Sequence, residues 1–179
     1  MLIVKILFVF MVGCKVKLKY IFLLTALSAP VAYADWTTKT DDDVFSGGKS
    51  AMMLGELSSI MSNAVFDCSE NKLTFSLVEE DNNSKLDEPI PVDLFVKIDG
   101  DEVIKLNALL MRRNSRFIGA ESSDKDDIIK LLKQLQAAKK KIIVGIQGKG
   151  GESRQSYSGD VINSTGAVSK FVKACKINL

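Results

Sequence analysis

The chain has 179 residues, with 24 lysine and arginine residues against 22 aspartate and glutamate residues, and it contains no histidine. The missing histidine excludes Ser-His-Asp and Cys-His nucleophilic sites and the usual histidine-bearing zinc sites. Four lysines and no acidic residue lie in residues 1–34, so the rest of the chain has 20 basic and 22 acidic residues. This balance gives no electrostatic reason for nucleic-acid binding, and we expect none.

The first 34 residues have the features of a secretory signal peptide. Lysines precede an apolar run over 20–27, and Ala32-Tyr33-Ala34 follows as an A-x-A cleavage site. The run is shorter than the roughly 20 residues that cross a bilayer, so we expect no stable membrane span after cleavage. A second apolar run before it favours translation from Met11; an N-terminal membrane anchor is the alternative. The prediction is a signal peptide at 1–34 and one domain at 35–179.

The beginning of the mature chain holds three features that imitate ligand sites. Trp36 is the single tryptophan, and we expect it in the core rather than stacked on a ligand. Asp41 to Asp43 lack the spacing of a calcium loop, so a solvated turn is expected. Gly48-Lys49-Ser50 lacks the earlier glycine of a phosphate-binding loop, which we exclude. Residues 51–60 fit a strand and a helix equally well.

Alternating apolar and polar residues mark the middle of the chain as strands. In residues 72–79, Leu73, Phe75 and Leu77 alternate with polar residues, which predicts a half-buried strand. Asp99-Gly100 predicts a hairpin with a tight turn. Further strands are expected over 92–99, 103–109 and 113–120, and the proline-containing segment 80–91 is expected to be a loop.

Two helices are expected in the second half. The first begins with a capping box at Ser123 and Asp126 and continues to about Ala138, and its apolar face is Ile128, Leu131, Leu132 and Leu135. Lys139 to Lys141 suit the negative end of its dipole; contact with an anionic surface is the alternative. Strands over 142–146 and 153–159 precede a last helix over 163–175, capped by Asn163 or Ser164. This order predicts an α+β fold, a sandwich-like antiparallel sheet packed by two helices.

Cys68 and Cys175 are the cysteines outside the leader, and a secreted domain normally pairs its cysteines. Cys175 shares a helical face with Val168 and Phe171, which directs its sulfur towards the core. We therefore predict a Cys68–Cys175 disulfide that closes a loop of about 108 residues. Two separate buried thiols are the alternative.

One basic cluster stands out as a possible partner-binding surface. Arg112, Arg113 and Arg116 lie beside Phe117, an arrangement that suits an acidic partner but also a solvent-facing strand. The carboxylates of Asp99, Asp101 and Glu102 are expected to be solvated turn residues rather than a catalytic pair. No motif indicates a catalytic, cofactor-binding or metal-binding residue, so we expect no enzyme activity and no cofactor.

A set of features along the chain resembles two exported families. The features are Trp36 after the leader, Cys68 before an alternating strand, Asp99-Gly100, L-x-x-A-K at Leu135–Lys139, and Ser158-Gly159 before the helix that ends in Cys175. This layout is similar to that of VasI-like type VI secretion accessory proteins and of invasion-associated locus B proteins. The resemblance implies a small periplasmic or secreted α+β domain with a disulfide and without known catalytic residues.

The leader, the missing histidine and this layout lead to one expected function. We expect an exported bacterial accessory or binding protein, periplasmic or secreted, that is linked to secretion or to interaction with a host or competitor. Its partner is expected to be another protein. The first alternative is a periplasmic inhibitor or immunity protein that blocks an envelope-acting enzyme through a surface loop. A hydrolase that uses carboxylates or a Ser–Lys pair is the second.

Overall fold

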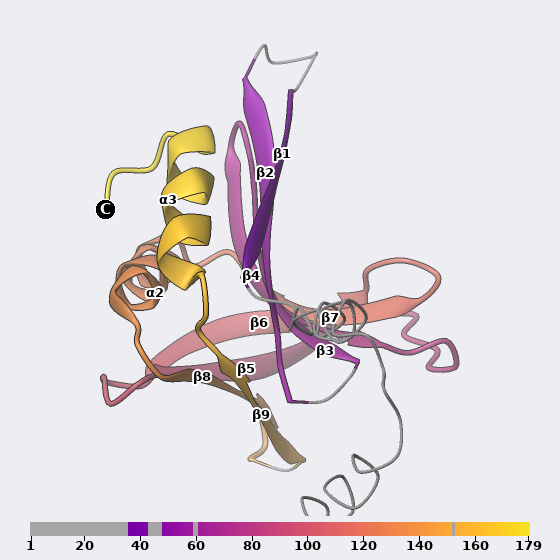
Figure 1. The fold of residues 1–179 in the computed structure, drawn as a ribbon. Coiled ribbons are helices and arrows are strands. Elements are labelled where there is room, and N and C mark those ends of the chain that lie inside the picture. Colours follow the sequence, from indigo (N-terminus) through magenta and orange to yellow (C-terminus); the bar gives the residue numbers. More distant parts are fainter. Residues whose placement is uncertain (1–35, 43–47, 59–60, 152) are drawn as a thin grey trace, which may run out of the picture. The chain divides into compact units, whose positions relative to one another are not determined.

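The computed structural model describes residues 36–42, 48–58, 61–151 and 153–179. The expected signal peptide, its cleavage site and the alternative start at Met11 lie outside the described residues, as do Asp43 to Gly47. The residues described form a single antiparallel sheet and two helices (Figure 1). The strands are β1 (Thr37–Asp42), β2 (Lys49–Glu56), β3 (Ser62–Ser69), β4 (Lys72–Glu80), β5 (Ile90–Ile98), β6 (Ile104–Arg112), β7 (Phe117–Ser122), β8 (Lys141–Gly148) and β9 (Arg154–Asp160), and the helices are α2 (Lys125–Ala137) and α3 (Ser164–Ala174).

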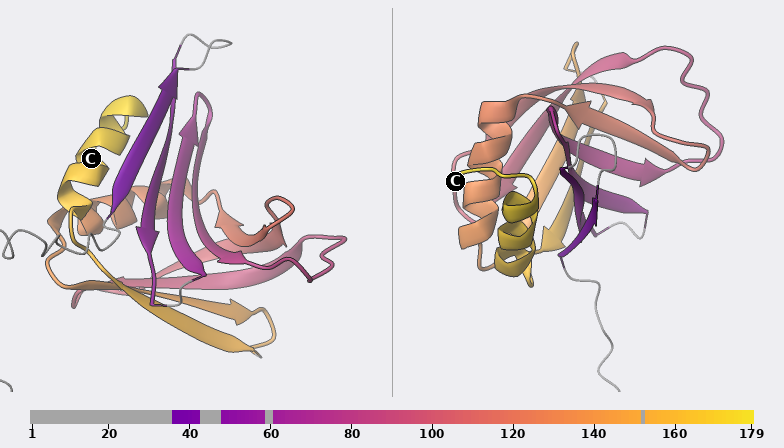
Figure 2. Two further views of the ribbon diagram at one scale, coloured as in Figure 1. Left: turned by 45° about the vertical axis from the view of Figure 1, so that its right-hand side comes forward. Right: turned by 90° about the horizontal axis from the view of Figure 1, so that it is seen from above.

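The sheet has the strand order β1-β2-β3-β4-β7-β6-β5-β8-β9, and each neighbouring pair is antiparallel. It curls until β9 returns to the end of β2, where Ser158 and Ser58 exchange hydrogen bonds (Figure 2). Gly159 permits this approach, since a Cβ atom there would lie 2.3 Å from the carbonyl oxygen of Glu56. The expected antiparallel sheet with two helices is confirmed, and it is one continuous curled layer.

Both helices cover the concave face of the sheet, called here the inner face. Helix α2 packs on β4, β5 and β6, and α3 packs on β1 and β2 (Figure 1). The predicted apolar face of α2 is fully buried. The expected cap of α2 is wrong by one residue, because Asp124 occupies the N-cap position in place of Ser123. Asn163, one of the two residues predicted to cap α3, occupies its N-cap position, and the Ser164 hydroxyl donates instead to the carbonyl oxygen of Leu135 at the end of α2.

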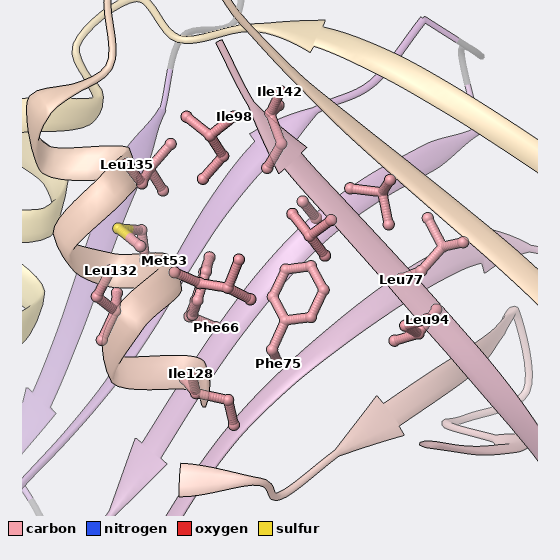
Figure 3. Packing of buried hydrophobic residues seen from close by; sticks show 14 of the residues in the cluster. Met53, Phe66, Phe75, Leu77, Leu94, Ile98, Ile128, Leu132, Leu135 and Ile142 are labelled. Carbon is pink, nitrogen blue, oxygen red and sulfur yellow. The ribbon is translucent and has the colours of Figure 1, made fainter. Parts of the chain in front are cut away.

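Aromatic rings form the centre of the core. The ring of Phe66 lies 4.8 Å from that of Phe75 and 6.2 Å from those of Phe171 and Trp36, and α2 closes over this cluster (Figure 3). Trp36 is 3% exposed, and its indole N–H donates to the carbonyl oxygen of Asp160 at 2.9 Å. The expectation of a core tryptophan is confirmed, and burial of its polar N–H is balanced by a hydrogen bond.

The predicted disulfide is present. Cys68 lies in β3 and Cys175 follows α3, and their Cα atoms are 6.0 Å apart. The bond therefore fastens the C-terminal helix to the inner face of the sheet. It adds to contacts that already anchor α3, among them the hydrogen bond from the Thr38 hydroxyl to the carbonyl oxygen of Ala167.

Several local expectations differ from the structure. Residues 51–60, left open between strand and helix, belong mainly to β2. The predicted hairpin at Asp99-Gly100 exists, but five residues rather than a tight two-residue turn connect β5 to β6. Asp41 and Asp42, expected in a turn, form the end of β1. The sequence analysis also identified no strand where β3 lies.

Candidate binding site at the open end of the sheet

The helices leave one end of the inner face uncovered. Alternate residues of β4 point inward, so Phe75 lies in the core beneath α2 while Leu77 lies away from that helix (Figure 3). Cross-strand pairing places Ala120 opposite both Leu77 and Leu110. A cavity of about 160 Å³ opens here, and we call it the mouth. Its lining residues are Leu77, Glu79, Leu110, Ile118, Ala120, Ile146 and Gln155.

The walls of the mouth are aliphatic side chains that the fold leaves partly exposed. Leu110, Ile118 and Ile146 are each intermediate in burial, although equivalent inner-face positions beneath the helices are fully buried. Ile90 pairs with Leu110 across the sheet and is 46% exposed. The apolar surface therefore continues from the cavity onto its rim.

A few polar groups stand among these apolar walls. Glu79 pairs across the sheet with Ser62, whose hydroxyl donates to Glu79 Oε1 at 3.3 Å. The hydroxyl of Tyr157 donates to Gln155 Oε1 at 2.9 Å. Burial, together with the Glu79 carboxylate beside it, raises the pKa of Tyr157 to about 12. Tyr157 therefore remains a neutral donor and acceptor at any physiological pH.

No cation of the described residues forms an ion pair with the Glu79 carboxylate. Its neighbours in the chain differ, because Glu80 pairs with Arg116 and Asp81 with Arg112. The mouth thus combines aliphatic walls, one negative charge and two neutral hydrogen-bonding side chains, the composition of a binding cavity.

The three arginines of the predicted partner surface do not form one cluster. Arg113 pairs with Asp67 at 2.7 Å, and Arg116 pairs with Glu80 at 3.0 Å. Arg112 donates to the backbone oxygens of Asp81 and Ser84 in the loop between β4 and β5. All three are therefore paired within the chain, and a role for them in partner binding stays a prediction.

Asp99 is a partly exposed turn residue, as expected, and its carboxylate also binds the backbone that follows α2. Its carboxylate accepts hydrogen bonds from the backbone N–H groups of Lys139, Lys140 and Lys141, at 2.8 to 2.9 Å. These bonds hold the pKa of Asp99 below its usual value. The lysines directly follow the C-cap of α2, as expected, and none lies in its last turn; a favourable interaction with the helix dipole stays a prediction.

Two larger hollows, of about 430 and 320 Å³, lie beside the disulfide. Both are more open to solvent than the mouth, and both are lined largely by polar and charged side chains. Within the described part of the chain, no group of three or more acidic or cysteine side chains could hold a metal ion, and no helix is long and apolar enough to cross a membrane.

Comparison of the chain with models of known protein families, with curated proteins and with solved structures finds no match.

The sequence analysis did not identify the mouth. Tyr157 comes from β9, far along the chain from Ser62 and Glu79 in the consecutive strands β3 and β4, and β3 itself was not predicted. One signal was present, because the alternation that placed Leu77 inward also places Glu79 inward at the end of the same strand. A carboxylate on an otherwise apolar strand face is unusual enough to indicate a site.

Proposed function

We propose that this protein is an exported bacterial accessory protein that binds another protein through the mouth and catalyses no reaction. The leader pattern and the Cys68–Cys175 disulfide support export to the periplasm or beyond, because disulfides form and persist in such compartments. The single observation that carries the binding role is the partly apolar mouth at the uncovered end of the inner face.

The size of the mouth favours a protein partner over a free metabolite. Its volume of about 160 Å³ is below the range of roughly 300–1,000 Å³ that is typical of small-molecule pockets. It suits a single anchoring side chain, and protein interfaces concentrate their binding energy in such buried anchors. The exposed side chain of Ile90, which pairs with Leu110 across the sheet, extends the apolar area around it. The resemblance to secretion accessory proteins makes a component of a secretion apparatus the partner that we propose.

A second candidate function, inhibition of an envelope-acting enzyme, has one specific observation in its favour. The loop between β4 and β5 is held in one conformation, because Asp81 accepts the N–H groups of Asn83 and Ser84 at 2.7 Å and Arg112 binds the loop backbone. The Ser84 hydroxyl is the main group that lowers the pKa of Asp81 to about 2, so the loop keeps this anchor down to low pH. A preordered loop costs little entropy on binding, as inhibitors require.

Site-specific photo-crosslinking in the producing cell distinguishes these functions. A photoreactive residue would replace Gln155 at the mouth, Asn83 in the loop, or Lys133 on the exposed side of α2 as the control, all three being solvent-exposed. Crosslinking of a secretion component at Gln155 alone supports the proposed function. Crosslinking of one enzyme at Asn83 supports the inhibitor. A partner found only at Lys133, or no partner at any position, would refute both.

A further inference from the structure

We propose that the mouth is a socket for a lysine side chain of the partner protein, with Glu79 as its counter-charge. This inference rests on the proposed function and specifies the chemistry that the site recognises. It follows from three properties of the mouth: a carboxylate that forms no ion pair within the described residues, aliphatic walls, and further acceptors at the same end of the cavity.

The carboxylate of Glu79 is short of positive charge. Its hydrogen-bond donor in β3 is the neutral hydroxyl of Ser62, and the Tyr157 hydroxyl beside it is also neutral. A carboxylate offers about four acceptor sites, so capacity for more donors remains. A negative charge in a partly apolar cavity is costly without a partner of opposite charge. A bound cation would relieve this cost, whereas a purely apolar ligand would increase it by excluding water.

The apolar walls of the mouth suit the methylene chain of a lysine side chain. Leu77, Leu110, Ile118 and Ile146 line the mouth, and a lysine side chain places a flexible chain of four methylene groups along surfaces of this kind. Its compact ammonium carries three donors. The acceptors present are the Glu79 carboxylate, Gln155 Oε1 and the Tyr157 oxygen. The planar fork of an arginine is matched best by both oxygens of a carboxylate, and one oxygen of Glu79 already accepts the Ser62 hydroxyl, whereas a compact ammonium needs no such fixed geometry.

The surrounding charges do not oppose an incoming cation. Arg112 and Arg116, the arginines nearest in the pairing of β4 with β7 and β6, are neutralised by Asp81 and Glu80. Arg154 precedes Gln155 on β9, and successive residues of a strand point to opposite faces, so Arg154 points away from the mouth. Glu79 therefore sets the sign of the charge inside the cavity.

The test uses small probes with the full-length exported protein. Nα-acetyl-lysine methylamide is titrated in NMR experiments against its norleucine and Nε-acetyl-lysine analogues, which keep the stem but lack the charge. We expect the lysine probe alone to shift the methyl resonances of Ile118 and Ile146. Glu79→Gln should weaken its binding at least about tenfold, because it removes the counter-charge and keeps the shape.

Matched variants keep this test decisive. Glu80→Gln removes the neighbouring carboxylate, which is paired with Arg116, and should leave the affinity unchanged. Gln155→Ala, at an exposed position, should weaken binding about threefold through loss of one acceptor; this variant serves if Glu79→Gln does not give the dispersed spectrum of a folded protein. Equal binding of lysine and norleucine, or unchanged affinity in both Glu79→Gln and Gln155→Ala, would overturn the inference.

Failure of the inference can be told from failure of the proposed function. If Glu79→Gln still crosslinks the same partner through position 155 at undiminished yield, the protein partner stands and the lysine socket is wrong. If the lysine probe binds but no protein crosslinks at position 155, the ammonium site stands and the protein partner is wrong. In that second case the source of the ammonium is a free alkylamine, and titration with cadaverine would show it.

Discussion

Loss of the Cys68–Cys175 disulfide should destabilise the whole domain rather than its C-terminal helix alone. The bond joins residues 107 positions apart, so it closes a loop that contains β4 to β9 and both helices. The chain-entropy model gives a stabilisation of about 4.8 kcal/mol at 25 °C for a loop of this length, because the disulfide lowers the conformational entropy of the unfolded chain. We expect Cys175→Ser to lower the free energy of unfolding by about 2–5 kcal/mol, the range observed for native disulfides in small secreted domains.

The structure indicates that the folded state will survive this change. Phe171 remains fully buried, and the Ser164 hydroxyl still binds the end of α2, so α3 keeps its position without the bond. Cys68 is 7% exposed, and serine there would bury a hydroxyl; alanine is therefore the better substitution at that position. Cys68→Ala, Cys175→Ser and the double variant should cost nearly the same, because each removes one and the same bond.

Urea unfolding followed by the fluorescence of Trp36 measures this loss, since Trp36 is the single tryptophan and is buried in the core. Wild-type protein with a reductant provides the matched control and should unfold at the same urea concentration as the variants. A loss below about 1 kcal/mol, or a double variant that loses the sum of two independent effects, would refute the reasoning from loop closure.

Three further predictions concern positions with close contacts or shifted pKa values. Gly55→Ala should cost about 1–3 kcal/mol and alter the fluorescence of Trp36, because a Cβ atom there would lie 2.2 Å from the indole; Gly119→Ala, with nothing nearer than 3.7 Å, should be almost neutral by the same assay. Asp99→Ala should lower the urea midpoint at neutral pH, and the difference from wild type should vanish as acid protonates the wild-type carboxylate below its depressed pKa; a difference that persists in acid would contradict this account. The pKa of Tyr157 is about 12 in the folded protein and near 10 in the unfolded chain, so the free energy of unfolding should fall as the pH rises from about 10 to 12. This fall should be smaller in Tyr157→Phe. If the free energy of unfolding depends on alkaline pH equally in both proteins, the pKa shift is absent.

The parts of the fold that the sequence predicted well are strands whose inward apolar residues alternate with mainly polar ones. Residues 72–79 and β5 are strands with the expected apolar residues inward, but Thr74 and Ser76 are buried as well, so β4 is covered on both faces and is not the half-buried strand that was predicted. In β3, by contrast, Ala64, Val65 and Phe66 are buried in succession, because Val65 is covered on the outer side of the curled sheet as well. Such a strand has no period of two. β1 is polar on both faces and gave no apolar signal at all.

The candidate site was not predictable from the sequence, for a reason of geometry. Its polar residues become neighbours only when the sheet curls and β9 returns towards β2. That approach depends on a missing side chain at Gly159 and on serine contacts between residues a hundred positions apart. Local periodicity indicates which face a residue occupies, but not which distant strand shares that face. The sequence could predict that Glu79 points inward, but it could not predict that Glu79 lies beside Tyr157.

The proposed binding site lies at a different end of the inner face from the contacts that stabilise the fold. Ser62 and Cys68 are the inner-face residues near the two ends of β3, six residues apart. At about 3.4 Å per residue, that places the mouth roughly 20 Å along the strand from the disulfide. The helices, the aromatic cluster and the disulfide stabilise one end of the inner face, and the side chains proposed to bind a partner occupy the other. Glu79 contributes no ion pair to the described fold, and the donor that it binds there, the buried Ser62 hydroxyl, is neutral. Recognition of a cation gives the negative charge of Glu79 a role.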